Sequence, residues 1–441
     1  MKISAPLIID VGVGLELPEV AKTRDGVEFN PRQSRWSYRE ALMTVSIDFG
    51  STVATSAPEL LAPSKLALLW YAKNKSANHL RNMHERLSKF LEFRAACIET
   101  PNQITVNDVL NYKASLELPR RWYLTSLAGF LKKWHRLGYP GVSEDVVRLL
   151  DSLTLSGNQK GAAVLTMDPI LGPFSDIEVE ALQDAMNEGY SNDELEENEY
   201  FLARLFLALG GRPEQYASLK ACDVRQESTE QGDHAYFLNL PRAKHRGQCS
   251  RTEFKSRALI PQIGAPLLDY ANRLRGKFVA LLDDSSQAPL FPQKRETSWA
   301  EGFEFHQTSK SLGILLKNSL SRLGVMSERT GEELNIAPIR FRRTLGTRAA
   351  QEGHGELVIA ELLDHSDTQN AGVYVAATPE IAQRIDRAVA MTMAPLAQAF
   401  KGVVIDDESQ ATRRCNDPAV SAQLKLLKHK PQQGFAYPAP G

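Results

Sequence analysis

Residues 338–374 read PIRFRRTLGTRAAQEGHGELVIAELLDHSDTQNAGVY, and this stretch decides how the rest of the chain is interpreted. Its apolar spacing predicts three helices, at 339–352, 356–363 and 371–375. The first helix opens on an arginine cluster, and Tyr374 follows nine residues after His365. Because guanidinium groups present forked donors that match phosphate oxygens, the pattern indicates a site that handles phosphate.

Length and composition describe a globular protein. The 441 residues, 43% of them hydrophobic, are enough for about two or three domains. Lys and Arg number 52 against 53 Asp and Glu, so the total charge does not indicate nucleic-acid binding. The charge is nevertheless segregated: residues 176–199 hold ten carboxylates and no Lys or Arg, whereas residues 242–257 hold six Lys and Arg against one Glu. We therefore expect an acidic face and a basic one.

The four cysteines are far apart and form no C-x-x-C pair, which argues against a zinc site and against a disulfide framework. The N-terminal apolar run is interrupted at Asp10, so it does not resemble a signal peptide. No uninterrupted apolar run reaches the roughly 18 residues that span a membrane. We expect a cytoplasmic protein with no membrane segment.

Residues 1–59 predict one strand, after Thr44, and suggest no function. Residues 60–155 change to a helical period and predict a compact bundle of about four helices. A capping pattern, Thr105 with Asp108, marks one helix start. The bundle carries basic residues interleaved with aromatic ones on faces predicted to be exposed: Lys73, Lys75, Arg81, Arg86, Lys89, Arg120, Arg121, Lys132, Lys133 and Arg136, with Trp122, Tyr123 and Trp134. These faces suit either DNA backbone binding or simple solvation.

Residues 156–173, rich in Gly and Pro, are interpreted as an interdomain linker. A second domain is expected at 174–400, ending in a helix at 379–400, with a tail at 401–441. Within it an apolar helix ends at Gly210-Gly211, which places Arg212 on a tight turn before Pro213.

Strands are predicted at 235–240 and 253–260, joined by a turn that carries Lys244. The expected fold class is mainly α with a small antiparallel β-sheet, that is, α+β.

Five motifs follow one another in a fixed order along the chain. They are Gly210-Gly211-Arg212 with Leu219 and Asp223, Lys244, Arg342-Arg343-Thr344, Leu363-Asp364-His365-Ser366, and Tyr374. In this order the sequence resembles the tyrosine recombinase, or phage integrase, family of DNA breaking-rejoining enzymes, whose pattern includes Gly-x-Arg, a hairpin lysine, H-x-x-R-H-T, L-G-H-S and a tyrosine. The resemblance covers about residues 60–395. It implies a helical core-binding domain at 60–155 and an integrase-like catalytic domain at 174–400.

The resemblance also implies a role for each residue. Tyr374 would attack the scissile phosphate and form a 3′-phosphotyrosyl link, so that rejoining needs no metal, ATP or other cofactor. Arg212 and Arg342 would clamp the phosphate. Lys244 would protonate the leaving 5′ oxygen, with Lys255 as the alternative, and His365 would donate a hydrogen bond to the phosphate unless it is a satisfied buried histidine.

The implied partners are double-stranded DNA and three further copies of the chain, in a homo-tetramer on DNA that serves a mobile element or a chromosome, near the nucleoid. Residues after Tyr374, with the helix at 379–400 as a candidate, would dock on a neighbouring copy.

Two positions depart from the family pattern. Ile339, which cannot transfer a proton, stands where the family usually has His or Lys, and Arg340 is expected to supply part of the missing positive charge. Gln215 replaces a carboxylate that usually supports the first arginine. Two other functions stay open: a DNA-binding protein of the same fold that does not cleave, and a helical protein-interaction scaffold.

Overall fold

The computed structural model describes residues 15–50, 58–96, 102–155, 157, 161–228, 234–242, 251–294, 300–364 and 371–376. The predicted helix at 379–400 and the tail at 401–441 lie outside these residues. None of the helices in the described part is long and apolar enough to cross a membrane.

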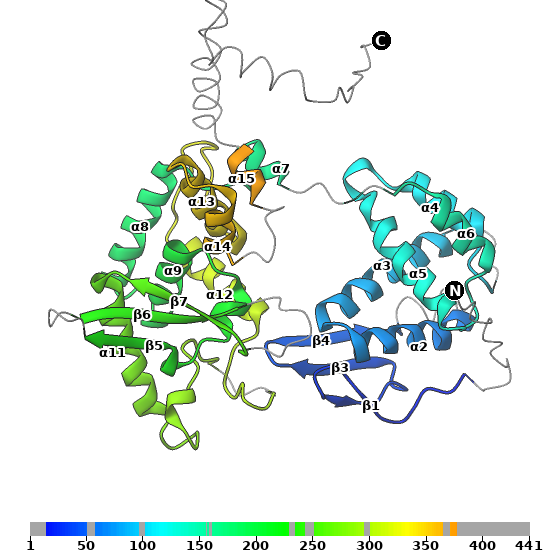
Figure 1. Ribbon diagram of the computed structural model, residues 1–441, viewed down its shortest axis with the longest axis horizontal. Helices are drawn as coiled ribbons and strands as arrows, with labels where there is room; N and C mark the ends of the chain where they lie inside the picture. Colours follow the sequence, from blue (N-terminus) through cyan, green and yellow to red (C-terminus); the bar gives the residue numbers. More distant parts are fainter. Residues whose placement is uncertain are drawn as a thin grey trace, which may run out of the picture. The chain divides into compact units, whose positions relative to one another are not determined.

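The N-terminal part of the described chain contains two antiparallel hairpins followed by a helical bundle (Figure 1). Its elements are β1 (Ala21–Lys22), β2 (Glu28–Phe29), β3 (Arg35–Glu40), β4 (Met43–Asp48), α2 (Pro58–Asn74), α3 (Ala77–Ala95), α4 (Val106–Ser115), η1 (Leu118–Arg120), α5 (Trp122–Arg136) and α6 (Glu144–Ser152). The strand predicted after Thr44 is confirmed as β4. The predicted capping pattern is also confirmed, because Thr105 and Asp108 form a reciprocal capping box at the start of α4.

One hydrophobic core joins the hairpins to the bundle. Trp36 and Ile47 from the β3–β4 hairpin are buried in the same cluster as Leu87 and Phe130 from the helices. Residues 21–49 therefore fold together with the helices rather than apart from them. The expectation that Trp134 lies on an exposed face is wrong: its side chain is fully buried, and its indole Nε1 donates to the Pro140 carbonyl at 2.9 Å.

The C-terminal part of the described chain is helical around a three-stranded antiparallel sheet, in the strand order β5-β6-β7 (Figure 1). Its elements are α7 (Ala162–Leu165), α8 (Asp176–Ser191), α9 (Glu197–Leu209), α10 (Pro213–Ala217), η2 (Ala221–Asp223), β5 (Val224–Ser228), β6 (His234–Pro241), β7 (Phe254–Leu259), α11 (Pro261–Phe278), η3 (Ser285–Gln287), α12 (Ser309–Ser321), α13 (Pro338–Gln351), α14 (Glu356–Leu362) and α15 (Gly372–Ala376). The predicted fold class, mainly α with small antiparallel sheets, is confirmed.

The predicted hairpin corresponds to β6 and β7, with Leu238 paired to Arg257. The sequence did not predict β5, because only its first residue, Val224, is buried and the other four are exposed. A strand without apolar alternation gives no periodic signal.

Two cores support this part. The larger one surrounds α9 and includes Phe206, Tyr216 and Phe341. The smaller one joins α13, α14 and α15, and it also contains Val164 of α7. Parts of residues 161–173, within the segment interpreted as a linker, pack against this core: Val164 is buried, Gly161 leaves space for Val373, and the Gly172 carbonyl accepts a hydrogen bond from Arg340.

Candidate active site

A rigid turn positions Arg212. Helix α9 ends at Gly210, whose φ of +54° is left-handed and suits glycine. A side chain at Gly211 would lie 2.8 Å from the ring of Tyr216, whose hydroxyl accepts from the Gly211 N–H at 2.9 Å and donates to the Leu205 carbonyl at 2.8 Å. These contacts fix the path of the chain after α9 and place Arg212 immediately before α10.

The Arg212 guanidinium reaches the end of α14. Both of its terminal nitrogens donate to the Asp364 carbonyl oxygen, each at 3.1 Å, and one lies 3.5 Å from the Asp364 carboxylate. The Arg212 side chain is 18% exposed. Burial lowers the pKa of Arg212, and the negative charge of Asp364 opposes that shift.

Gln215 supports this turn through its amide. Its side-chain oxygen accepts from the Arg212 backbone N–H at 3.0 Å, and its NH₂ group donates to the Pro241 carbonyl at 2.9 Å and to the Asp364 carboxylate at 3.4 Å. A carboxylate at this position could not make the last two hydrogen bonds, because an ionised carboxylate is only an acceptor. Gln215 therefore differs from the family pattern, but its neighbours are hydrogen-bond acceptors that suit an amide and not a carboxylate.

Arg342 lies beside Arg212. Its guanidinium is buried on α13 and donates to the carbonyls of Gly210, at 3.2 Å, and Leu363. Burial lowers the pKa of Arg342 to about 10, and the positive charge of Arg212 adds to this effect. The two arginines therefore bind the consecutive carbonyls of Leu363 and Asp364. Two neighbouring cations repel each other, so this arrangement favours an anion between them.

Tyr374 packs on the same helix that carries Arg342. Gly346 is four residues after Arg342 and so lies on the same face of α13. A Cβ at Gly346 would stand 2.7, 2.8 and 2.9 Å from three carbons of the Tyr374 ring, so only glycine leaves room for the ring. The Tyr374 side chain is 6% exposed. Burial raises its pKa, and the charges of Arg342, Arg343 and Arg212 oppose that rise.

The structure therefore places Arg212, Arg342 and Tyr374 in one region, where α13 meets the end of α14. Sequence reasoning missed Gly346, although a signal was present. A glycine inside a helix costs about 1 kcal/mol relative to alanine, and such a residue usually has a packing reason.

The other two predicted site residues, Lys244 and His365, lie outside the described residues. Lys255, the alternative to Lys244, is described on β7. Its Nζ lies 2.6 Å from the Glu361 carboxylate and 3.7 Å from that of Asp364, at the edge of the arginine pair.

The predicted role of Arg340 is wrong. The Arg340 guanidinium is fully buried, and it donates to the carbonyls of Pro169, Gly172 and Asn335 and to the Glu178 carboxylate. It joins the 169–172 segment to α8 and α13 and does not supply charge to the site. Ile339, beside it, is 46% exposed and offers no proton acceptor.

The L-x-x-x-D part of the first motif is structural. Leu219 is fully buried, and the Asp223 carboxylate accepts from the Lys220 backbone N–H at 2.8 Å and pairs with Arg251 at 2.6 Å. These contacts fix the chain between α10 and β5. Among the described residues, no group of three or more His, Cys, Asp or Glu side chains lies close enough to hold a metal ion.

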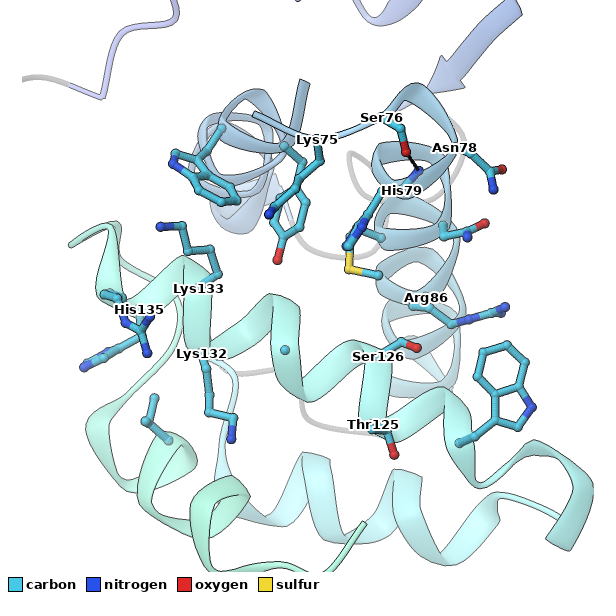
Figure 2. Close-up of a pocket in the computed structure, with 18 of the residues that line it drawn as sticks. Lys75, Ser76, Asn78, His79, Arg86, Thr125, Ser126, Lys132, Lys133 and His135 are labelled. Carbon is cyan, nitrogen blue, oxygen red and sulfur yellow. Dashed lines mark hydrogen bonds between the residues drawn. The ribbon is translucent and has the colours of Figure 1, made fainter. Parts of the chain in front are cut away.

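A basic groove of about 930 Å³ lies between α2, α3 and α5 of the N-terminal part (Figure 2). Its lining includes five Lys or Arg residues and one carboxylate, Asp151, which pairs with Lys132 at 2.7 Å. Lys133 and Lys75 lie 3.7 and 5.7 Å from the centre of the Trp70 ring. The groove therefore combines positive charge, aromatic surface and exposed polar side chains.

Arg86 behaves differently from the other basic residues predicted to be exposed. Its side chain is buried, with the guanidinium 3.6 Å from the centre of the Tyr123 ring and 4.9 Å from that of Trp122. The expectation of exposure is wrong for Arg86, because cation–π contacts hold its side chain against the bundle.

No protein-family model and no curated protein matches the chain. Solved structures do match it. The XerH site-specific recombinase bound to palindromic difH substrate, a post-cleavage complex, is 15% identical, with 74% of this chain and 84% of that chain covered and a TM-score of 0.46. A lambda integrase dimer bound to a COC′ core site is 10% identical, with 81% and 94% covered and a TM-score of 0.44. The Tn1549 transposon integrase in complex with transposon right end DNA is 12% identical, with 74% and 99% covered and a TM-score of 0.40.

These structures are recombinases and integrases, the family that the motif order resembles. Identities of 10% to 15% and TM-scores below 0.5 describe a distant likeness.

Proposed function

We propose that this chain is a tyrosine-type site-specific DNA recombinase, or integrase, that cuts and rejoins duplex DNA through a 3′-phosphotyrosyl intermediate. One observation carries the proposal. Arg212 and Arg342, from separate segments, bind the consecutive carbonyls of Leu363 and Asp364, and Tyr374 packs one helical turn away from Arg342. A tyrosine hydroxyl can serve as the nucleophile, and a pair of arginines beside it can stabilise the charge that grows on the phosphate oxygens during transfer.

The chemistry conserves the phosphodiester. The Tyr374 hydroxyl oxygen forms a bond to phosphorus, and the bond from phosphorus to the 5′ oxygen breaks. The phenol loses one proton and the leaving 5′ oxygen gains one, so no oxidant, reductant or nucleotide is consumed. Arg212 and Arg342 donate to the non-bridging oxygens, whose negative charge grows as the attack begins. Rejoining is the reverse attack by a 5′ hydroxyl on the phosphotyrosine.

Proton transfer to the leaving group is assigned to a lysine, and a hydrogen bond to the phosphate is assigned to His365. Lys244 protonates the leaving oxygen in this proposal, and Lys255, held at the edge of the arginine pair, is the alternative. His365 supports the phosphate. Because Ile339 cannot accept the phenol proton and burial raises the pKa of Tyr374, ionisation of the tyrosine is the demanding step.

DNA affinity would come from phosphate contacts in both domains. We assign 60–155 as the core-binding domain, 156–173 as the linker and 174–400 as the catalytic domain. The basic groove supplies Lys75, Lys133 and Arg136 for the backbone, with Asn78 and Asn82 as polar side chains for base edges. A homo-tetramer on DNA, serving a mobile element or chromosome near the nucleoid, completes the proposal.

Covalent trapping tests the chemistry. Duplexes enriched from a random pool by binding to the Tyr374→Phe protein supply the DNA site, and a nick beside the scissile phosphate prevents rejoining. Wild-type protein should then accumulate a denaturant-resistant protein–DNA complex, and Tyr374→Phe should form none. Tyr112→Phe, which changes another buried tyrosine, is the matched control and should form the complex normally.

The alternative, a DNA-binding protein that does not cleave, is favoured by two observations: Ile339 occupies the position where the family pattern has His or Lys, and Tyr374 is almost fully buried. Salt-sensitive binding of duplex by wild type without any covalent complex would select this alternative. Absence of binding to every duplex would instead favour the interaction scaffold.

A further inference from the structure

Asp364 adopts an unusual backbone conformation at the centre of the site. It follows α14 with a φ of +50°, in the left-handed region that few residues other than Gly, Asn and Asp enter. Its side chain is 5% exposed. A charged residue that is both buried and left-handed needs a specific environment to hold it.

That environment is a set of cations from three segments. The Arg242 Nε, at the end of β6, donates to the Asp364 carboxylate at 2.8 Å. The Lys255 Nζ, on β7, lies 3.7 Å from the same oxygen, and Arg212, before α10, lies 3.5 Å from the other oxygen. Gln215 adds a neutral donor at 3.4 Å. The buried Asp364 carboxylate therefore lies close to three cations: Arg212 on the turn before α10, Arg242 just after β6, and Lys255 on β7.

We propose that the Asp364 carboxylate is an internal counter-anion of the phosphate site: it holds Arg212, Arg242 and Lys255 together before DNA arrives, and it weakens the binding of phosphate to the free protein. This inference rests on the proposed function of the same site. Asp364 is a positioning residue in this scheme, because it acts through the cations and does not touch the reacting atoms.

The physical reason is competition between two anions. A carboxylate presents two oxygens, as the non-bridging pair of a phosphodiester does, and the same guanidinium fork suits both. When a phosphate approaches Arg212, it meets the negative charge of Asp364 within the same group of cations, and like charges at short range repel strongly where water is excluded. The repulsion lowers affinity for any duplex, so stable binding then depends more on contacts elsewhere.

The test measures duplex binding in the Tyr374→Phe protein, so that cleavage does not disturb the equilibrium. Asp364→Asn keeps the shape of the side chain and tolerates a left-handed φ, but it removes the charge. We expect binding about tenfold tighter at low salt. The plot of log affinity against log salt, between about 50 and 200 mM, should become steeper by about 0.9, the change expected for one more neutralised phosphate.

The control is Asp176→Asn, which makes the same change of charge at a side chain that is 86% exposed and pairs with Arg348. It should leave the salt slope unchanged. A second variant, Asp364→Gly, suits the left-handed backbone and should reproduce the tighter binding if the asparagine variant folds poorly.

The outcomes separate the two proposals. Weaker or unchanged binding, or an unchanged slope, in the folded Asp364 variants overturns the counter-anion and leaves the proposed function intact. If the Tyr374→Phe protein with Asp364 intact binds no duplex at all, the proposed function fails, and the role of Asp364 fails with it.

Discussion

Replacing Gly346 with alanine should separate DNA binding from DNA cleavage. The added Cβ would lie 2.7 to 2.9 Å from three carbons of the Tyr374 ring, whereas ordinary contacts begin at 3.4 Å. The ring must therefore move by about 0.5 to 0.7 Å. Overpacking of this kind costs about 1–3 kcal/mol. The helix propensity of alanine returns about 1 kcal/mol, so the protein should lose about 0–2 kcal/mol of stability and remain folded.

The catalytic effect of Gly346→Ala should be larger than its effect on stability. Displacement of a reacting group by about 1 Å can slow a reaction roughly 100-fold, so covalent complex should form about 10 to 100 times more slowly on the nicked duplex. The affinity for duplex should stay within about twofold, because no charged group changes.

The matched control is Gly276→Ala in α11, where a Cβ meets nothing within 4 Å. It should raise the free energy of unfolding by about 0.5–1 kcal/mol in urea and leave cleavage unchanged. If Gly346→Ala were as stabilising as Gly276→Ala and cleaved DNA at the wild-type rate, the packing of Tyr374 on α13 would be refuted.

Two further predictions concern the framework of the site. Burial lowers the pKa of His306, whose Nδ1 donates to the Ala217 carbonyl at 2.7 Å, to about 3 from 6.5. As the pH falls, this histidine takes up a proton in the unfolded chain before it does so in the folded protein. The stabilising contribution of neutral His306 to the free energy of unfolding is therefore complete above pH 6.5 and declines as the pH falls towards 3. About 2 kcal/mol of that free energy should be lost by about pH 5. Urea midpoints at about pH 7 and about pH 5 should therefore differ less in His306→Asn than in wild type, and an equal difference in both proteins would contradict the assignment. Gln215→Glu should destabilise the protein by about 1–3 kcal/mol, because a carboxylate cannot donate to Pro241 and would face Asp364. Thermal unfolding measures this loss, with Gln226→Glu on the exposed part of β5 as the control, and equal melting temperatures for the two variants would argue against the amide network.

The sequence predicts features that depend on local rules. The helix start at Thr105 follows from its capping pattern with Asp108, and the capping box is present. The end of α9 at Gly210 follows from the conformational freedom of glycine, and the start of α10 follows from Pro213. Because these signals involve residues a few positions apart, no tertiary information is needed to read them.

Features that depend on distant contacts were missed. The sequence cannot distinguish Arg340 from Arg342, two arginines on one helix, although the first binds the 169–172 segment and the second faces Arg212. The burial of Arg86 against Tyr123 likewise depends on the packing of α3 on α5. In each case the neighbour that decides the role of the arginine comes from another segment, and periodicity along the chain does not identify it.

The two unusual residues around Arg212 are best understood as one change. A carboxylate is absent at Gln215, where the resemblance leads us to expect one, and a carboxylate is present at Asp364, where the pattern has glycine. The Gln215 amide donates to the Asp364 carboxylate, so the two positions are in contact. Negative charge near the arginine is thereby kept but moved from α10 to Asp364, the second residue after α14. Asp364 also binds Arg242, the residue after β6, whereas Gln215 donates to the Pro241 carbonyl at the end of β6. A shift of β6 or β7 can therefore reach Arg212 through the Asp364 carboxylate as well as through Gln215, and the residue that follows Asp364 along the chain is His365.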